Sequence, residues 1–199
     1  MYKPFALLAV AAALVACSPA PAPTAPAVEP LASTPSPAVG KEIETRIVNA
    51  AGAQIGFANF HEGPAGVLIR LEFNPKALTP GWHGAHLHEK GDCADFAAGF
   101  KASGAHVKHG EAGEAHGLLN AAGPEAGDLA NIFVADTDGP FAAELYTTMV
   151  TLAPQAHEGR RPLLGAEGAA FIIHANADDH ATQPIGGAGD RVACAVLRP

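Results

Sequence analysis

Residues 81–93 read GWHGAHLHEKGDC, and within them His86 and His88 stand two positions apart. Residues 85–89 are predicted to form a strand, in which side chains at positions i and i+2 project from one face, about 6.5–7 Å apart. The two imidazoles therefore aim at one point. Because imidazole nitrogen suits a borderline metal such as copper, the spacing predicts a metal site. On its own, the pair could also be a coincidence on an alternating strand.

Alternating apolar residues on both sides of this stretch predict an all-β fold. Residues 67–73 place four large apolar side chains on one face, with Arg70 and Glu72 on the other. Residues 43–47 alternate in the same way, and Ile55 and Phe57 do so after a turn signal. Further strands are predicted at residues 131–134, 145–152, 170–173 and 191–194. The 22 Gly and 17 Pro also favour strands and turns over long helices.

The composition restricts the class of protein. With 199 residues and 48% hydrophobic content, the chain can build the core of one globular domain. The net charge of -8 argues against nucleic acid as a partner, because phosphates need a basic patch. An acidic surface also repels small anions, so an anionic substrate would need a locally positive approach.

Residues 1–40 are predicted to be a leader and a tether. Lys3 precedes an apolar run over residues 5–16, which is shorter than the roughly 20 residues of a membrane-spanning helix and is typical of an export signal. Residues 14–17 (Leu-Val-Ala-Cys) resemble the lipobox of bacterial lipoproteins, which implies a lipid on Cys17. Seven prolines over residues 18–40 predict an extended linker. The predicted division is a signal peptide at 1–16, a lipidated cysteine with its linker at 17–40, and a domain at 41–199.

A long loop is predicted at residues 89–128. Loops longer than about 12–15 residues are usually functional or disordered. Metal ligation or a disulfide could order this one, because either supplies energy that the loop lacks in apolar burial. The residues suited to such roles are Cys93, His106, His109, His116 and Asp128.

Several motifs follow one another in order: His86-Leu87-His88-Glu89, Gly91-Asp92-Cys93, Gly127-Asp128-Leu129, and C-terminal segments containing His174 and Arg191. From about Lys41 to the C-terminus, the chain resembles the copper-zinc superoxide dismutases, specifically the bacterial periplasmic branch. The resemblance implies an eight-stranded antiparallel Greek-key barrel or sandwich with two long functional loops. It also implies an enzyme that converts superoxide to oxygen and hydrogen peroxide, with one copper and one zinc per subunit.

The resemblance assigns a role to each ligand-type residue. Copper would be held by His86, His88, His106 and His174, and zinc by His106, His116 and Asp128. The family's Asn-Pro after the bridging histidine is replaced by Val107-Lys108-His109, so His109 stays an alternative for the bridge. Glu125 stands where the family has its remaining zinc histidine, so it is either a carboxylate ligand or a solvated loop residue.

The resemblance also implies residues that support the metals. Asp178 would link a copper histidine to a zinc histidine, and Arg191 would attract and orient superoxide. His106 would leave copper on its reduction and carry a proton. Since lipidation would consume Cys17, Cys93 and Cys194 would form a disulfide, which export to an oxidising compartment permits.

Other charged and imidazole side chains are expected to have no metal role. His83 would be a structural histidine bonded to the backbone. Lysines on a loop, here Lys101 and Lys108, are usually solvated, although they could add to a positive field. His157 and His180 are expected to be exposed.

The predicted function is therefore superoxide dismutation in the bacterial periplasm, by an enzyme tethered to a membrane through Cys17. Ser18 follows the cysteine where an aspartate would indicate inner-membrane retention, which favours the outer membrane. The alternative is a non-enzymatic copper-binding or copper-delivering lipoprotein on the same fold, which would need neither Arg191 nor an intact bridge. Whether the protein is a monomer or a homodimer stays open.

Overall fold

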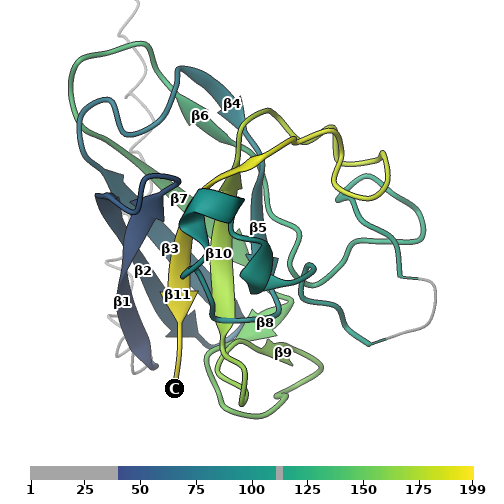
Figure 1. Ribbon diagram of the computed structural model, residues 1–199. Helices are drawn as coiled ribbons and strands as arrows, with labels where there is room; N and C mark the ends of the chain where they lie inside the picture. Colours follow the sequence, from purple (N-terminus) through teal and green to yellow (C-terminus); the bar gives the residue numbers. More distant parts are fainter. Residues whose placement is uncertain (1–39, 111–113) are drawn as a thin grey trace, which may run out of the picture. The chain divides into compact units, whose positions relative to one another are not determined.

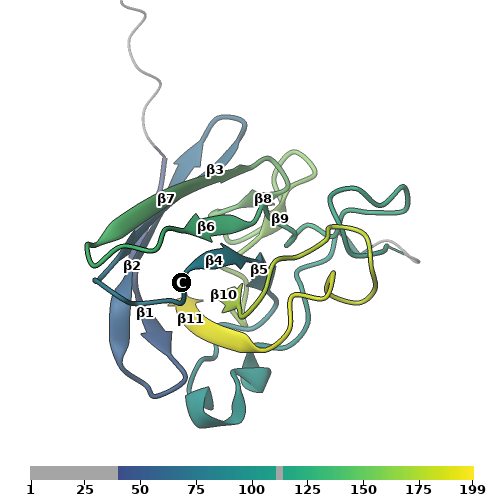
Figure 2. The ribbon, with the colours of Figure 1, turned by 90° about the horizontal axis from the view of Figure 1, so that it is seen from above.

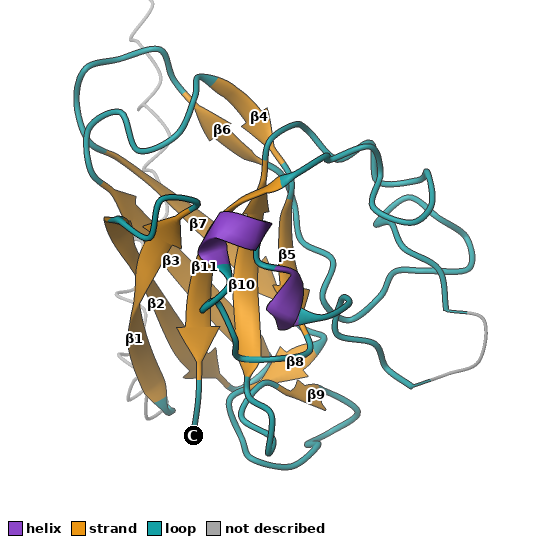
Figure 3. Cartoon of the chain, in the orientation of Figure 1, coloured by secondary structure: helices purple, strands orange, loops and turns teal. Residues whose placement is uncertain are grey.

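The structure is a computed structural model that describes residues 40–110 and 114–199. The predicted signal peptide, Cys17 and residues 18–39 of the linker lie outside the described residues. In the described ranges no helix is both long and apolar enough to cross a membrane. These ranges contain strands, loops and two short 3-10 helices, η1 (Phe96–Ala98) and η2 (Lys101–Ser103) (Figure 3).

The strands form an eight-stranded antiparallel arrangement once interrupted strands are joined. Gly84 alone separates β4 from β5, and residues 148–149 separate β7 from β8, while β9 is a short extra segment paired in parallel with β8. Joining these two pairs leaves eight strands besides β9. The segments are β1 (Glu42–Asn49), β2 (Gln54–Gly63), β3 (Gly66–Phe73), β4 (Gly81–His83), β5 (Ala85–His88), β6 (Ile132–Val134), β7 (Phe141–Thr147), β8 (Val150–Thr151), β9 (Arg161–Pro162), β10 (Ala169–His174) and β11 (Arg191–Leu197).

The strand order is that of a Greek key. The main sheet runs β5-β10-β11-β1-β2-β3-β7, and β4, which continues into β5, pairs with β6. Strand β3 therefore lies between β2 and β7, and the chain crosses over to reach β4. The sheet curls, so that β2, β3 and β7 lie across from β5 and β10 (Figures 1 and 2). The predicted all-β Greek-key fold is confirmed.

The alternation of side chains along each strand determines which residues form most of the core. The apolar residues of β3 that were predicted to share a face are all buried: Val67, Ile69, Leu71 and Phe73. Phe57 contradicts its prediction, because it is 37% exposed, while Ala58 and Phe60 face the core. The register of β1 with β2 passes from Ile47↔Gly56 to Val48↔Gln54. Ile55 is therefore the extra residue of a β-bulge, which reverses the alternation after it.

Two long loops leave the sheet beside β5 and β10. One joins β5 to β6, and the other joins β10 to β11 (Figure 1). The Cys93–Cys194 disulfide, predicted from the resemblance, is present and attaches the first loop to β11. Phe100 of this loop is fully buried in a small cluster with both cysteines, Ala170 and Ile172. The disulfide and this cluster together hold the loop against β10 and β11.

Candidate metal centre

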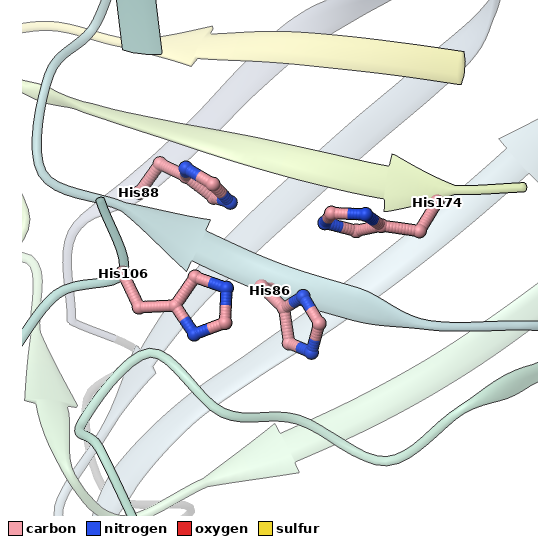
Figure 4. A group of neighbouring side chains, drawn as sticks. All are labelled: His86, His88, His106 and His174. Carbon is pink, nitrogen blue, oxygen red and sulfur yellow. The ribbon is translucent and has the colours of Figure 1, made fainter. Parts of the chain in front are cut away.

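Four imidazole rings converge where β5, β10 and the first long loop meet (Figure 4). His86 and His88 come from β5, and His174 is the last residue of β10, which pairs with β5. His106 comes from the loop, where it forms an isolated bridge with His88. All four rings are buried, and one nitrogen of each lies within 4.8 Å of the others.

Each ring is oriented through one nitrogen and leaves the other without a protein partner. His88 Nδ1 donates to Gly104 O at 2.9 Å, and His174 Nδ1 donates to Gly189 O at 2.9 Å. A ring that donates through one nitrogen presents a lone pair at the other, as a metal ligand requires. Among the described residues, the buried ring nitrogens without a partner include His86 Nδ1, His88 Nε2, His106 Nε2 and His174 Nε2. This donor set fits copper.

Burial keeps three of these rings neutral. It lowers the pKa of His88 well below its usual value, and the charges of His106 and Arg191 lower it further. It also lowers the pKa of His174 to about 3. Burial lowers the pKa of His86 too, although the hydrogen bond to Asp178 opposes this shift. A neutral imidazole binds a metal without first losing a proton.

A second group of ligand-type residues, His86, His106, His116 and Asp128, adjoins the first and shares His86 and His106 with it. Asp128 Oδ1 lies 2.8 Å from His116 Nδ1 and 3.1 Å from His106 Nδ1. Glu125 Oε2 lies 2.8 Å from His106 Nδ1. Glu125 is only 6% exposed, which contradicts the interpretation of a solvated loop residue. Glu125 is not one of the four mutually close residues of this group and adjoins them through His106. The imidazoles of His106 and His116, the carboxylate of Asp128 and this adjoining carboxylate are donors that fit zinc.

The carboxylates reverse the pKa pattern in this second group. Burial alone would lower the pKa of His116, but its hydrogen bonds to Asp128 and Asp178 outweigh burial and raise the pKa to about 10. The pKa of His106 is raised in the same way by Asp128 and Glu125. Burial would raise the pKa of Asp128, but the hydrogen bonds from His106 and His116 lower it instead. The metal-free group is therefore held together by imidazolium-carboxylate pairs.

These shifts predict that the metal-free protein is most stable near pH 6.5. The raised pKa of His116 gives stability that is complete below 6.5 and is lost as the pH rises towards 10. The lowered pKa of His174 keeps its ring neutral when folded, so stability is lost as the pH falls below 6.5. Thermal unfolding of chelator-treated protein at about pH 5, 6.5 and 9 measures both losses. His174→Ala should reduce the loss on the acid side without abolishing it, because the pKa values of His86 and His88 are also lowered, and the exposed His157→Ala should not change it. A melting temperature rising steadily from acid to base contradicts the prediction.

Asp178 links the two groups. Its Oδ2 accepts from His86 Nε2 at 2.8 Å, and its Oδ1 accepts from His116 Nε2 at 3.1 Å. Asn131, which sequence reasoning missed, donates to Asp178 O at 2.8 Å and accepts from Asp178 N at 2.9 Å. Gly186 has φ +58, and a Cβ there would overlap Asp178 Oδ1. In the sequence, this close approach is marked only by the glycines at residues 186 and 187.

Arg191 lies at the start of β11, opposite His174 in the strand register. One terminal nitrogen, NH1, donates to Phe100 O and Ser103 Oγ, and the other, NH2, donates to Gly104 O, each at 2.9 Å. Ser103 Oγ also lies 3.4 Å from His88 Nδ1. Burial lowers the pKa of Arg191, but an arginine stays charged in proteins. A fixed cation therefore lies beside the four histidines, and nothing in the sequence indicated the contribution of Ser103.

The other histidines lie outside both groups. His109, the alternative for the bridge, belongs to neither group, and its Nε2 lies 3.9 Å from Glu114, whereas His106 belongs to both. His83 is buried, with its ring nitrogens 2.7 Å and 2.8 Å from the carbonyl oxygens of His174 and Thr79. The ring of His157 is 58% exposed. The prediction for His180 was wrong: its ring is only 17% exposed and lies 3.5 Å from Asp178, because its backbone N donates to that carboxylate.

Comparison with known proteins identifies the family. Residues 54–197 match the family described as Copper/zinc superoxide dismutase (SODC). The chain belongs to this family. It is 51% identical over 155 residues to the copper-zinc superoxide dismutase of Caulobacter vibrioides, covering 77% of this chain and 84% of that one. A second such enzyme, from Aquifex aeolicus, is 39% identical over 154 residues, covering 76% and 84%.

The fold agrees with a solved structure of similar sequence. The crystal structure of a SOD-like protein from Bacillus subtilis superposes with a TM-score of 0.70 at 31% identity. The match covers 80% of this chain and 99% of that one. As a copper/zinc superoxide dismutase family member, the chain carries copper and zinc, and its two histidine-rich groups fit these metals.

Proposed function

We propose that the chain is a superoxide dismutase in which His86, His88, His106 and His174 hold copper. His106, His116 and Asp128 hold zinc, and Glu125 adds a carboxylate on the zinc side. The observation that carries this proposal is the convergence of four buried ring nitrogens that lack a protein partner. The reaction takes two superoxide ions and two protons to one oxygen and one hydrogen peroxide.

When bound, copper supplies the redox chemistry by alternating between Cu(II) and Cu(I), and zinc supplies a positive charge of constant oxidation state. Arg191 binds the superoxide anion and orients it, which offsets the repulsion from a chain of net charge -8. His106 holds and releases a proton at Nε2, while Asp128 and Glu125 fix its Nδ1. Asp178 holds the rings of His86 and His116 through their Nε2 atoms, which leaves each Nδ1 for a metal.

The copper-delivering alternative is not favoured. A protein that stores or delivers copper needs the four histidines alone. Arg191, held by three hydrogen bonds, and His106, shared between the two groups, are features that the dismutase requires.

We place the enzyme in the bacterial periplasm, exported by residues 1–16 and tethered by a lipid on Cys17. The lipobox-like residues 14–17 and the proline-rich linker support this placement, and Ser18 favours the outer membrane. Cell fractionation of the full chain and of Cys17→Ser tests it: the parent protein should sediment with outer membranes, and the variant should not.

Metal reconstitution tests the proposed function directly. The metal-free protein should be inactive, and one equivalent each of copper and zinc should restore superoxide loss, with both metals found by elemental analysis. The exposed His157→Ala is a control that should behave as the parent protein does. Full copper with no turnover would favour the alternative, and less than about one tenth of an equivalent of zinc would reject the zinc site.

A further inference from the structure

Glu125 is held from two sides by residues of one segment. Its inner oxygen, Oε2, lies 2.8 Å from His106 Nδ1, and its outer oxygen, Oε1, lies 2.9 Å from Lys108 Nζ. His106 and Lys108 are two positions apart, so in an extended segment they project to the same side. Lys108 was expected to be solvated; its side chain is 49% exposed, and its ammonium group also forms this ion pair with Glu125.

Backbone hydrogen bonds hold this segment in place. Val107 N donates to Leu87 O at 2.9 Å, Gly127 N donates to Val107 O at 2.8 Å, and Leu87 N donates to Gly127 O at 2.8 Å. Val107 is buried in the main core. A Cβ at residue 127 would overlap Leu87 O, so this close approach requires glycine. These three backbone hydrogen bonds and the burial of Val107 fix the position of residues 106–108 relative to Glu125.

The charges explain why Glu125 needs a cation on its outer side. Glu125, Asp128 and Asp178 are three buried carboxylates around the zinc side. Among the described residues, Lys108 is the one lysine or arginine that forms an ion pair with any of them. A carboxylate differs from the family's histidine because it has two oxygens and can rotate. When Lys108 binds one oxygen of Glu125, only the second oxygen is left to bind the metal. Hydrogen-bond partners outside the metal's ligands orient other ligating side chains in the same way.

We propose that Glu125 Oε2 is the fourth zinc ligand and that Lys108 is the positioning residue that makes Glu125 a one-oxygen ligand. This inference rests on the zinc site of the proposed function. It explains two departures from the family pattern together, because the carboxylate at 125 and the lysine in the place of Asn-Pro contact each other. It also assigns Lys108 to the zinc ligand rather than to attraction of the substrate.

Zinc titration of the copper-loaded protein against a competing chelator tests the inference. Lys108→Met should lower zinc affinity about 10- to 100-fold, Glu125→Gln should lower it at least as much, and Lys108→Arg should restore most of it. Lys76→Met is the matched control, since Lys76 forms an exposed pair of the same 2.9 Å with Asp138. It should leave zinc affinity unchanged. Cobalt substituted for zinc should show altered visible bands in Lys108→Met and Glu125→Gln, but not in the control.

A double-mutant cycle separates positioning from a general effect. If Lys108 acts through Glu125, Lys108→Met should cause no further loss in the Glu125→Gln background. Parental affinity in Lys108→Met, or an equal further loss in that background, would overturn the inference while leaving the zinc site intact. Absence of zinc uptake by the parent protein would instead overturn the zinc site itself. Unchanged copper spectra in every variant would show that the fold and the copper site persist.

Discussion

Replacing both Cys93 and Cys194 with serine is expected to lower the free energy of unfolding of the metal-free protein by about 2–5 kcal/mol. The disulfide joins residues 101 positions apart, so it restricts a large part of the unfolded chain. Cys194 is fully buried and Cys93 nearly so, and each serine would place a hydroxyl in an apolar cluster. The melting temperature should fall by roughly 4–20 °C.

Calorimetry of the parent protein and the double variant, with and without reductant, measures this effect. Reductant should lower the melting temperature of the parent and leave that of the double variant unchanged. Equal melting temperatures in the absence of reductant would show that the apolar cluster alone holds the loop.

The same substitution should also slow turnover, because the disulfide and the site are connected through the loop. Phe100 packs in the cluster with the two cysteines, and its carbonyl oxygen accepts from Arg191. Gly104, on the same loop, accepts from both Arg191 and His88. Loosening this loop therefore releases the cation and one copper-side ring together, so stability and activity should fall in parallel.

The sequence predicts structure that depends on a short repeat of residue types along one strand. It does not predict structure that depends on contacts between residues far apart in the chain. The alternation of β3 and the spacing of His86 and His88 determine which face each side chain occupies. The bulge at Ile55 depends on the register with β1, so the outward turn of Phe57 has no local signal. The environment of Glu125 is assembled from His106 and Lys108, which are distant in sequence. Ser103 and Asn131 act through single contacts between loops, and no spacing rule identifies such contacts.

Arg191→Ala is expected to lower kcat/KM for superoxide by about 10- to 1000-fold while copper content stays unchanged. The guanidinium is the fixed cation beside the four histidines, and it attracts an anion to a protein of net charge -8. Arg191→Lys should fall between the parent and alanine, because an ammonium keeps the charge but cannot reproduce the three hydrogen bonds to the loop. Steady-state rates at constant copper occupancy, checked by the visible copper spectrum, measure these effects.

Arg198→Ala is the matched control for this experiment. Arg198 also donates to a carbonyl of the first loop, that of Gly91, but it follows the far end of β11, roughly 20 Å along the strand from Arg191. Both substitutions change the net charge equally, so only the position of the lost cation differs. Added salt should slow the parent and Arg198→Ala by similar factors and slow Arg191→Ala less, because screening acts on the attraction that this variant has lost. Equal rates for the two alanine variants would mean that total charge, and not a cation fixed beside the copper ligands, governs capture of superoxide.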